Sequence, residues 1–305
     1  MTRILVTGGA GFIGSHLVRK LLAHGDEVVV LTRPSTNLDR LGDVEKSIRV
    51  VHGDVGDAAG VLSALGAWRP EACAHLAWYG DPKTYLTSHA NLDELSASNA
   101  FLLALMQAGC RRFLMTGTCA EYAPSTDRLR EDSPAGPSTL YAASKLALQL
   151  VSAQLATEFD ARVTWARIFH LFGPFENSQR LVPALINALL ADKEFGATAG
   201  DQVRDYLHVA DVASALCGLI DREVDGVVNI CSGNPVTVRE LIETTADILD
   251  RRELVRFGQV TSRRWDPPYI CGDNARLVNA GWRPNFDLRS GLEETVDWWR
   301  AQARK

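Results

Sequence analysis

The chain has 305 residues, of which 46% are hydrophobic and 23% are charged, and its formal net charge is −5. This length suits one large domain or two interlocked ones, with a substantial buried core. The net charge is small and the two signs are interspersed, so we expect neither nucleic acid nor an anionic membrane as a partner.

The hydrophobic residues are divided among short runs. None of these runs approaches the roughly 20 residues needed to span a bilayer, so no integral membrane protein is expected. The first expected strand starts at Arg3, which leaves no room for a signal peptide. The six cysteines are scattered without a Cys-x-x-Cys pair, which favours reduced thiols over disulfides or a metal site. These features predict a cytoplasmic protein.

The chain opens with an expected strand, a glycine-rich turn and a helix. Residues 4–7 are apolar or β-branched, residues 8–14 are Gly-Gly-Ala-Gly-Phe-Ile-Gly, and helical spacing continues from Ser15. Glycines at 8, 11 and 14 let the backbone turn tightly and come close to a pyrophosphate. The helix that follows directs unpaired N–H groups at that phosphate. We therefore predict a dinucleotide site, with contacts from Gly8, Gly11, Phe12, Ile13 and Gly14.

The adenosine half of the cofactor is expected near the ends of the next two strands. The second strand ends at Thr32 and Arg33, where many dinucleotide folds have an acidic residue that binds the ribose 2′-hydroxyl. This departure favours a 2′-phosphate and hence NADP(H), with NAD(H) still possible; a surface arginine is the alternative for Arg33. Asp54 follows the third strand and is placed to meet the adenine amino group, or else it only stabilises its turn.

Strand-like and helical segments alternate through the first half of the chain. Expected strands cover residues 28–31, 48–51, 72–76, 113–116 and 163–168, and the clearest helix runs from Ser96 to Ala108. This alternation predicts an α/β fold with a doubly wound parallel sheet, the Rossmann arrangement. After His170 the pattern loosens. We therefore predict a dinucleotide-binding domain over 1–169 and a smaller α/β, mainly substrate-binding lobe over 170–305, some of whose segments return to the first domain.

A helix expected to start near Leu140 carries the first candidate catalytic residues. Ser138 or Thr139 can cap it, and Tyr141 and Lys145 lie four residues apart on one face. A phenol with a pKa of about 10 is a poor acid or base at neutral pH. We expect the Lys145 ammonium and an oxidised nicotinamide to lower the pKa of Tyr141. The spacing is common on structural helices, and its place after a dinucleotide-binding half-sheet is what favours catalysis.

The strand before this helix supplies a third candidate. Residues 116–120 are Thr-Gly-Thr-Cys-Ala, and ligands bind at the carboxyl ends of parallel strands. We expect the Thr118 hydroxyl to hydrogen-bond the carbonyl or alcohol oxygen of a substrate near Tyr141. A turn-stabilising role for Thr118 is the alternative.

Several motifs together give the chain a family resemblance. They are the glycine turn, Gly53-Asp54-Val55, His75-Leu76-Ala77, Tyr141-Ala142-Ala143-Ser144-Lys145, Arg204-Asp205-Tyr206-Leu207-His208 and Gly291-Leu292-Glu293-Glu294. With these motifs the chain resembles the extended short-chain dehydrogenase/reductases that act on nucleotide sugars, over nearly its whole length. The resemblance implies an NAD(P)-dependent oxidoreductase with a nucleotide-diphosphate sugar as substrate. It also implies a homodimer formed by the helix of Tyr141 and the helix near Ser96.

The resemblance assigns roles to single residues. Tyr141 matches the acid/base of the family, Lys145 its ribose ligand and Thr118 its hydroxyl hydrogen-bond donor. Arg204 matches the arginine that grips the pyrophosphate, which suits a planar, permanently charged group. The other expected cofactor contacts are Val55, Leu76, Ala77 and Thr116. The other expected substrate contacts are Trp78, Cys119, His170, Gln179, Arg180, Val182, Arg263 and Arg264, with the register of the last two left open.

Departures from the family pattern disfavour two of the reactions that the family catalyses. The 4,6-dehydratases carry Asp and Glu directly after the catalytic Thr, whereas Cys119 and Ala120 stand here. Water elimination across C5 and C6 needs an acid and a base at those places. Enzymes that couple 3,5-epimerisation to reduction have a Cys and a His where this chain has Ala120 and Arg180. His170 replaces the usual Asn of its segment, and we have no firm account of that change.

Two enzymes fit what remains. The first reduces the C4 keto group of a nucleotide-linked 4-keto-6-deoxyhexose with NADPH, and Tyr141 is its proton donor. The second is a 4-epimerase that oxidises and re-reduces the same centre with tightly held NAD. Thr32 and Arg33 favour the reductase, because a net reduction draws on NADPH. A non-catalytic NADP(H)-binding regulator would not need the three catalytic residues, and a reductase of non-nucleotide ketones would not need Arg204.

Overall fold

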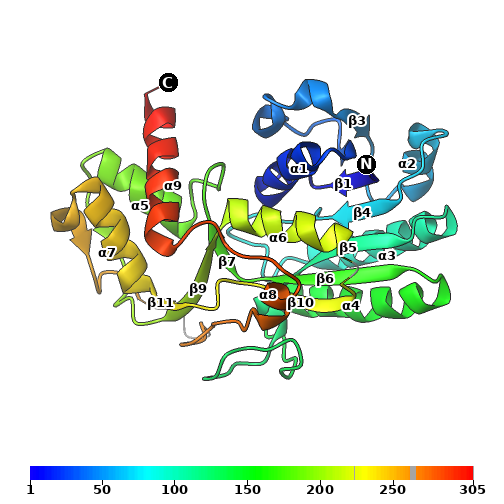
Figure 1. The fold of residues 1–305 in the computed structure, drawn as a ribbon. Helices are drawn as coiled ribbons and strands as arrows, with labels where there is room; N and C mark the ends of the chain where they lie inside the picture. Colours follow the sequence, from blue (N-terminus) through cyan, green and yellow to red (C-terminus); the bar gives the residue numbers. More distant parts are fainter. Residues whose placement is uncertain (223, 262–265, 305) are drawn as a thin grey trace. The chain divides into compact units, whose positions relative to one another are not determined.

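The fold was obtained as a computed structural model that describes residues 1–222, 224–261 and 266–304. The chain divides into two compact units, each of which collects segments from different parts of the sequence (Figure 1). The first unit comprises Met1–Ala123, Pro134–Ile168 and Ala213–Val228, and the second comprises Pro124–Ser133, Phe169–Val212 and Asn229–Lys305.

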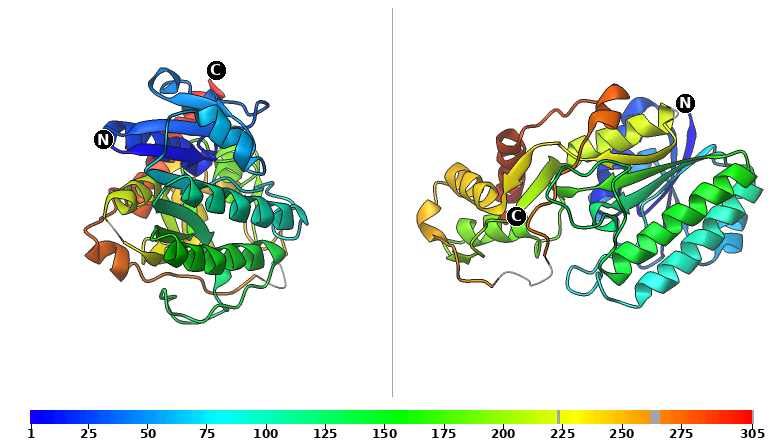
Figure 2. Two further views of the ribbon diagram at one scale, coloured as in Figure 1. Left: turned by 90° about the vertical axis from the view of Figure 1, so that its right-hand side faces the viewer. Right: turned by 90° about the horizontal axis from the view of Figure 1, so that it is seen from below.

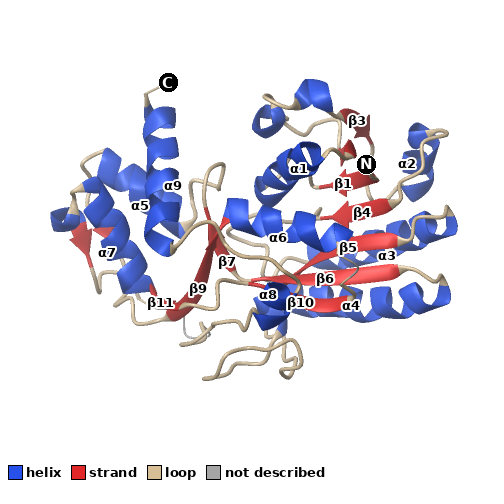
Figure 3. Ribbon diagram, in the orientation of Figure 1, coloured by secondary structure: helices blue, strands red, loops and turns tan. Residues whose placement is uncertain are grey.

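The first unit is organised around a seven-stranded sheet with the order β10-β6-β5-β4-β1-β2-β3 (Figure 3). Its strands are β1 (Arg3–Thr7), β2 (Glu27–Thr32), β3 (Arg49–His52), β4 (Ala72–His75), β5 (Arg112–Thr118), β6 (Arg162–Ile168) and β10 (Gly226–Ile230). The pairs from β6 through β3 are parallel. Helices cover both faces, so the strands are apolar runs rather than alternating ones. The predicted doubly wound sheet is confirmed.

Helices follow several strands of this unit, and one further helix, α6 (Val209–Asp221), begins in the second unit and enters this one at Ala213. The others are α1 (Phe12–His24), α2 (Ala58–Leu65), α3 (Ala90–Gln107) and α4 (Leu140–Glu158), with short 3-10 turns η1 (Asp39–Leu41), η2 (Glu45–Ser47) and η3 (Cys119–Glu121). Helices α3 and α4 lie side by side on one face of the sheet (Figure 2). Phe101 and Leu105 of α3 pack there against Trp165 of β6 in the main core. Helix α3 begins at Ala90 rather than at Ser96, because the buried Asn91 amide anchors its first turn to the preceding backbone.

The second unit has smaller sheets. Strands β11 (Pro235–Thr237), β9 (Val203–His208) and β7 (His170–Phe172) form one, and β8 (Phe195–Gly196) pairs with β12 (Val255–Arg256). Its helices are α5 (Leu181–Leu190), α7 (Val238–Leu249), α8 (Ala275–Asn279) and α9 (Leu288–Ala303), and η4 (Arg252–Leu254) is a 3-10 turn. Leu185, Leu241 and Leu292 of three of these helices meet in its core. None of the helices in the described ranges combines the length and apolarity needed to cross a bilayer.

Candidate active site

The glycine loop between β1 and α1 is shaped by close backbone contacts. Gly8 has a φ of 68°, and a Cβ there would lie 2.7 Å from the backbone that follows β4. A Cβ at Gly14 would collide with the Gly8 carbonyl oxygen. Helix α1 starts after the extended Gly11, and no side chain caps the first turn, which begins with Phe12 and Ile13. The first amides of α1 are therefore left for an anion, and the loop fits the pyrophosphate of the predicted cofactor.

A threonine at the end of β1 holds the segment after β4 next to this loop. The Thr7 hydroxyl accepts hydrogen bonds from the amides of Leu76 and Ala77, each at 3.2 Å. It lies 2.8 Å from Nδ1 of His75. Burial lowers the pKa of His75 to about 3, so this imidazole is neutral and structural. Leu76 and Ala77 thus flank the glycine loop as predicted, and their contact with a cofactor stays a prediction.

Two arginines come from the segment that follows β2. Thr32 is buried at the end of the strand and Arg33 is exposed directly after it. The sequence did not single out Arg40, whose Nη1 lies 3.5 Å from the carbonyl oxygen of Ala10 in the glycine loop. Burial lowers the pKa of Arg40 somewhat, but a guanidinium remains charged at neutral pH. Both cations suit the 2′-phosphate of NADP(H).

The turn after β3 uses its aspartate internally. Asp54 Oδ1 accepts a hydrogen bond from the Gly56 amide at 2.8 Å, so the turn-stabilising role that the sequence left open is present. Val55 packs its side chain against the main core. Contacts of Asp54 and Val55 with the adenine stay predictions.

The three candidate catalytic residues come from β5 and α4. Thr139, and not Ser138, caps α4, because its hydroxyl accepts from the Ala142 amide at 3.2 Å. This places Tyr141 in the first turn, where its phenol hydrogen-bonds the Thr118 side chain. The Tyr85 ring packs edge-on against the Tyr141 ring, with 5.1 Å between centroids. Thr118 and Tyr141 are thus brought together as the sequence predicts.

Lys145 is tied to the same strand. Its Nζ donates to the Thr116 carbonyl oxygen at 3.0 Å and lies 3.9 Å from the centroid of a Trp78 ring. Trp78, predicted as a substrate contact, is itself held by a 2.8 Å hydrogen bond from its indole N–H to Asn91. Burial lowers the pKa of Lys145 to about 7, which the nearby carboxylate of Glu94 partly opposes. Lys145 is therefore only partly protonated at neutral pH.

The pKa of Tyr141 differs from the sequence expectation. Burial raises it above the ordinary value of a phenol, and the hydrogen bond with Thr118 opposes that rise only in part. The expected lowering by Lys145 is wrong for the protein itself, because the Lys145 ammonium bonds to a strand carbonyl rather than to the phenol. A phenol with a raised pKa stays protonated at neutral pH.

Sequence reasoning gave no role to a buried ion pair next to this group. Glu121, at the end of η3, is fully buried and accepts from Arg167 of β6 at 2.7 Å. The Thr-x-x-Glu spacing from Thr118 to Glu121, typical of a capping box, is the signal that could have found it. Cys119, predicted to contact the substrate, is half-buried in the same turn.

In the second unit, His170 and Arg204 occupy neighbouring strands. His170, on β7, has a ring centroid 5.7 Å from that of Tyr206, and its Nδ1 has no hydrogen-bond partner in the described ranges. Burial and the charges of Arg204 and Arg180 lower the pKa of His170 to about 3, so the ring is neutral. Arg204, on β9, donates to Asp266 at 2.7 Å and is 5% exposed in its side chain.

The loop before α5 holds the remaining predicted residues. Gln179 is exposed, and Arg180 is the N-cap residue of α5. Val182 is 3% exposed and packs in the core of this unit, so its side chain is structural and only its backbone remains for a nucleotide. Glu176, which was not predicted, has a buried Oε2 that no described residue hydrogen-bonds, and burial raises its pKa to about 8. Arg263 and Arg264 lie outside the described residues.

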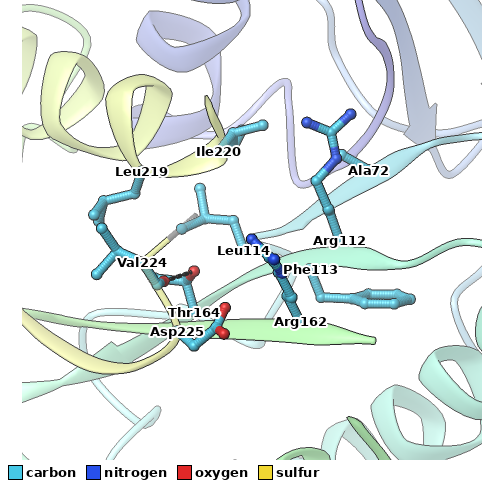
Figure 4. Close-up of a pocket in the computed structure, with 10 residues that line it drawn as sticks. All are labelled: Ala72, Arg112, Phe113, Leu114, Arg162, Thr164, Leu219, Ile220, Val224 and Asp225. Atoms are coloured by element: carbon cyan, nitrogen blue, oxygen red, sulfur yellow. Dashed lines mark hydrogen bonds between the residues drawn. The ribbon is translucent and has the colours of Figure 1, made fainter. Parts of the chain in front are cut away.

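A small pocket at the opposite end of the sheet is not this site. It is lined by residues at the starts of β4, β5 and β6, by the end of α6 and by the segment that follows α6, among them Ala72, Arg112, Arg162, Ile220 and Asp225 (Figure 4). Ligands of open α/β sheets bind at the carboxyl ends of strands, where Thr118 lies.

The family profile described as "NAD dependent epimerase/dehydratase family" matches residues 4–231. The chain belongs to this family. The dTDP-glucose 4,6-dehydratase of Mycobacterium tuberculosis is 29% identical, with 98% of this chain and 93% of that protein covered. The UDP-glucose 4-epimerase of Azospirillum brasilense is 26% identical, with 97% and 91% covered. The resemblance drawn from the sequence motifs is thereby confirmed at the level of the family.

Solved structures of both kinds of relative share the fold. A dTDP-glucose 4,6-dehydratase from Streptomyces venezuelae with NAD bound superposes with a TM-score of 0.89 at 28% identity, covering 99% of this chain and 98% of that one. A UDP-glucose 4-epimerase from Thermus thermophilus in complex with NAD gives 0.88 at 27% identity, covering 98% and 99%. Because the matches include two different activities, membership of the family does not by itself select a reaction.

Proposed function

We propose that this member of the epimerase/dehydratase family reduces the C4 keto group of a nucleotide-linked 4-keto-6-deoxyhexose with NADPH. The observation that carries the proposal is the end of β5. There Thr118 hydrogen-bonds the Tyr141 phenol, and the next two residues, Cys119 and Ala120, provide no carboxylate. The site can therefore exchange one proton with a substrate oxygen, which is what ketone reduction requires.

Each residue of the group has a distinct task in this reaction. When bound, the reduced cofactor supplies the hydride. Tyr141 holds the proton that the new alcohol oxygen needs, and its raised pKa keeps that proton in place before the reaction. Thr118 is placed to hydrogen-bond the same oxygen and orient it. Lys145 donates to the Thr116 carbonyl and provides positive charge beside the nicotinamide ribose when protonated.

A dehydratase role is disfavoured although several relatives carry that name. Elimination of water needs an acid and a base beyond the tyrosine, and a methyl group at Ala120 can be neither. The half-buried thiol of Cys119 is the one ionisable group at these two positions. Glu121 does not replace the missing acid, because its carboxylate is buried against Arg167 and Trp165.

NADP(H) is proposed over NAD(H) on the basis of Arg33 and Arg40. We expect Arg33→Ala and Arg40→Ala each to raise the Kd of NADPH about tenfold and to leave that of NADH within about twofold, because only NADPH carries the 2′-phosphate. Calorimetry on the unliganded protein measures both constants. The control is Arg49→Ala, which removes an exposed arginine of β3 that bonds to the Ala64 carbonyl. Equal weakening of both cofactors would contradict the assignment.

In the second unit, Arg180 and Arg204 are proposed to bind the diphosphate of the sugar nucleotide, with His170 close to them. Within the described part of the chain, one ring nitrogen of the neutral His170 imidazole has no partner, so it can accept or donate one hydrogen bond to a bound phosphate or sugar. This assignment is consistent with a similar structure, 27% identical, that holds UDP-glucuronic acid and NAD.

The protein is further proposed to form a homodimer through α3 and α4. These adjacent helices expose Leu92, Leu150 and Val151, which are 51%, 57% and 41% exposed. Large apolar side chains grouped on neighbouring helices are typical of an interface. Sedimentation velocity would detect the dimer.

The second candidate is a nucleotide-sugar 4-epimerase, which the NAD-bound epimerase structures favour. The deciding experiment incubates the protein with a panel of nucleotide-linked 4-keto-6-deoxyhexoses and NADPH, and follows the absorbance of NADPH. A parallel series offers UDP-glucose without added cofactor and follows the formation of UDP-galactose. The proposal expects stoichiometric NADPH consumption in the first series. Turnover in the second series alone would establish the epimerase instead.

A further inference from the structure

The buried carboxylate of Glu121 hydrogen-bonds the backbone at the end of β5. Glu121 Oε1 accepts a hydrogen bond from the Thr118 amide at 2.8 Å. The Thr118 hydroxyl in turn accepts from the Ala120 amide at 3.2 Å, so the two residues form a capping box around η3. These bonds fix the backbone of Thr118, whose hydroxyl also hydrogen-bonds Tyr141. The position of Glu121 therefore sets the position of the proposed proton-transfer group.

Two residues of β6 hold this carboxylate in place. Arg167 Nε donates to Glu121 Oε2 at 2.7 Å, and Trp165 Nε1 lies 3.1 Å from each carboxylate oxygen. The Arg167 side chain is 5% exposed, and its guanidinium lies 4.3 Å from the centroid of the Tyr122 ring. Burial raises the pKa of Glu121, and the charge and hydrogen bond of Arg167 oppose that rise. A protonated Glu121 would leave this buried guanidinium without an anion, which is costly. We therefore take Glu121 to be ionised.

One residue of β5, Gly117, leaves space for the side chains of Glu121 and Trp165. A Cβ at Gly117 would collide with the Trp165 indole nitrogen and lie 2.5 Å from Glu121 Oε1. The φ of Gly117 is not in the left-handed region, so the glycine is needed for space and not for conformation. Because residue 117 is a glycine, the Glu121 carboxylate and the Trp165 indole fit against the strand between Thr116 and Thr118.

The charge of Glu121 also faces the other two catalytic candidates. It raises the pKa of Lys145 and that of Tyr141. Other groups act on the same pair: Tyr85 and Cys119 face Tyr141, while Glu94 of α3 and His75 of β4 face Lys145. Among these groups Glu121 is the one that also bonds the backbone of Thr118.

We propose that Glu121, paired with Arg167, is a positioning residue for the Thr118–Tyr141–Lys145 group. It fixes the Thr118 backbone through the capping bond and presents a negative charge that favours protonated Lys145 and protonated Tyr141. Its role in turnover rests on the proposed function, whereas its effect on Lys145 does not depend on any substrate.

The charge is tested first, on the protein without ligands. Glu121→Gln keeps an oxygen for the Thr118 amide but removes the negative charge. In ¹³C-labelled protein the six lysines give few signals, and Lys145→Arg identifies the one of Lys145. The wild-type signal is expected to titrate at a pKa of about 7, and the signal in Glu121→Gln about one unit lower. An unchanged titration in a folded variant would overturn the electrostatic part of the proposal.

The geometry is tested with Glu121→Asp. This variant keeps the charge beside Arg167 but is one methylene too short to reach the Thr118 amide as well. We expect kcat to fall about tenfold while KM stays within about twofold, and the Lys145 titration to stay close to that of the wild type. An unchanged kcat of Glu121→Asp would overturn the positioning role. This test does not depend on whether Glu121→Gln folds.

A structural control separates these effects from general destabilisation. Thr295→Val removes a buried hydroxyl that bonds to the Gly291 carbonyl in α9, in the second unit. It is expected to lower the melting temperature without moving either the Lys145 titration or the pH profile of kcat. If the lysine titration shifts as expected but no 4-keto sugar is reduced, the proposed function fails and the electrostatic effect of Glu121 stands.

Discussion

The two units differ in how their polar site residues are satisfied. In the first unit, Thr118, Tyr141 and Lys145 bond to one another or to the strand that carries them. In the second unit, His170 Nδ1 and Glu176 Oε2 are buried and have no hydrogen-bond partner among the residues that the structure describes. Unsatisfied buried polar groups are rare in proteins, and each costs free energy. In the described part of the first unit, Arg167 Nη1 and Asn99 Oδ1 are the corresponding atoms, and neither belongs to the Thr118–Tyr141–Lys145 group. Under the proposed function, that group is pre-organised for reaction, and the unpaired atoms of His170 and Glu176 serve a ligand.

The ion pairs of the buried arginines also differ between the two units. The buried arginine of the first unit, Arg167, pairs with Glu121 through Nε while its Nη1 lacks a hydrogen-bond partner among the described residues, and both side chains are at most 5% exposed. In the second unit Arg204 pairs with Asp266, whose side chain is 34% exposed and therefore easier to displace. A diphosphate can exchange with the exposed aspartate, whereas the pair of Glu121 and Arg167 offers no such access.

Loss of the proton donor is expected to have the largest effect. Tyr141→Phe keeps the ring that packs on Tyr85 but removes the hydroxyl, so kcat should fall by about three orders of magnitude or more while the Kd of NADPH stays within about threefold. Steady-state assays and calorimetry measure the two quantities. Tyr79→Phe, which removes a hydroxyl bonded to Thr84, is the matched control. Substantial activity of Tyr141→Phe would show that the first unit is not organised around this phenol.

Burial of Lys145 is expected to make stability depend on pH. Its pKa in the folded protein is about 7, below the ordinary 10.5. Between these values the unfolded chain holds a proton that the folded protein does not, so the free energy of unfolding rises with pH. Below pH 7 the cost of burying the ammonium is present in full. The stability gained by Lys145→Met should therefore be about 3 kcal/mol larger at pH 6 than at pH 9.

Urea unfolding of both proteins at the two pH values checks this expectation. The exposed Lys193 provides the control, because Lys193→Met should give the same difference in stability at both. A pH-independent effect of Lys145→Met would mean that Lys145 is protonated in the folded protein at pH 9, and that the first unit stabilises the ammonium more than its burial indicates.

The sheet and the glycine loop could be predicted because their signals are local. A β-branched run, a Gly-x-x-Gly-x-x-Gly turn and an amphipathic helix specify the first β-α unit whatever lies elsewhere. The spacing of Tyr141 and Lys145 likewise depends only on helical periodicity. The start of α3 was predicted too late because Asn91, a polar residue, anchors its first turn.

The ion pairs could not be predicted in this way. Glu121 and Arg167 are 46 residues apart and meet only because β5 and β6 are neighbours in the sheet. Arg204 and Asp266 are 62 residues apart and meet within the second unit. Local spacing carries no information on such partners, although the capping-box spacing from Thr118 to Glu121, which was not used, would have distinguished Glu121 from a surface charge. The predicted effect of Lys145 on Tyr141 failed for the same reason, since the carbonyl that binds Lys145 belongs to a neighbouring strand.

The smallest effect is expected in the second unit. Arg204→Ala should raise the KM of the nucleotide sugar about tenfold with kcat nearly unchanged, because a diphosphate contact binds substrate and transition state alike. Arg204→Lys should recover little, since a point charge lacks the planar pair of donors. Asp266→Asn, which removes the competing carboxylate, should leave KM equal or lower, and Arg256→Ala, at an exposed pair with Glu194, should leave it unchanged. A fall in kcat alone for Arg204→Ala would instead place this arginine at the transition state. The second unit would then take part in the chemistry, and the contrast with the first unit would no longer hold.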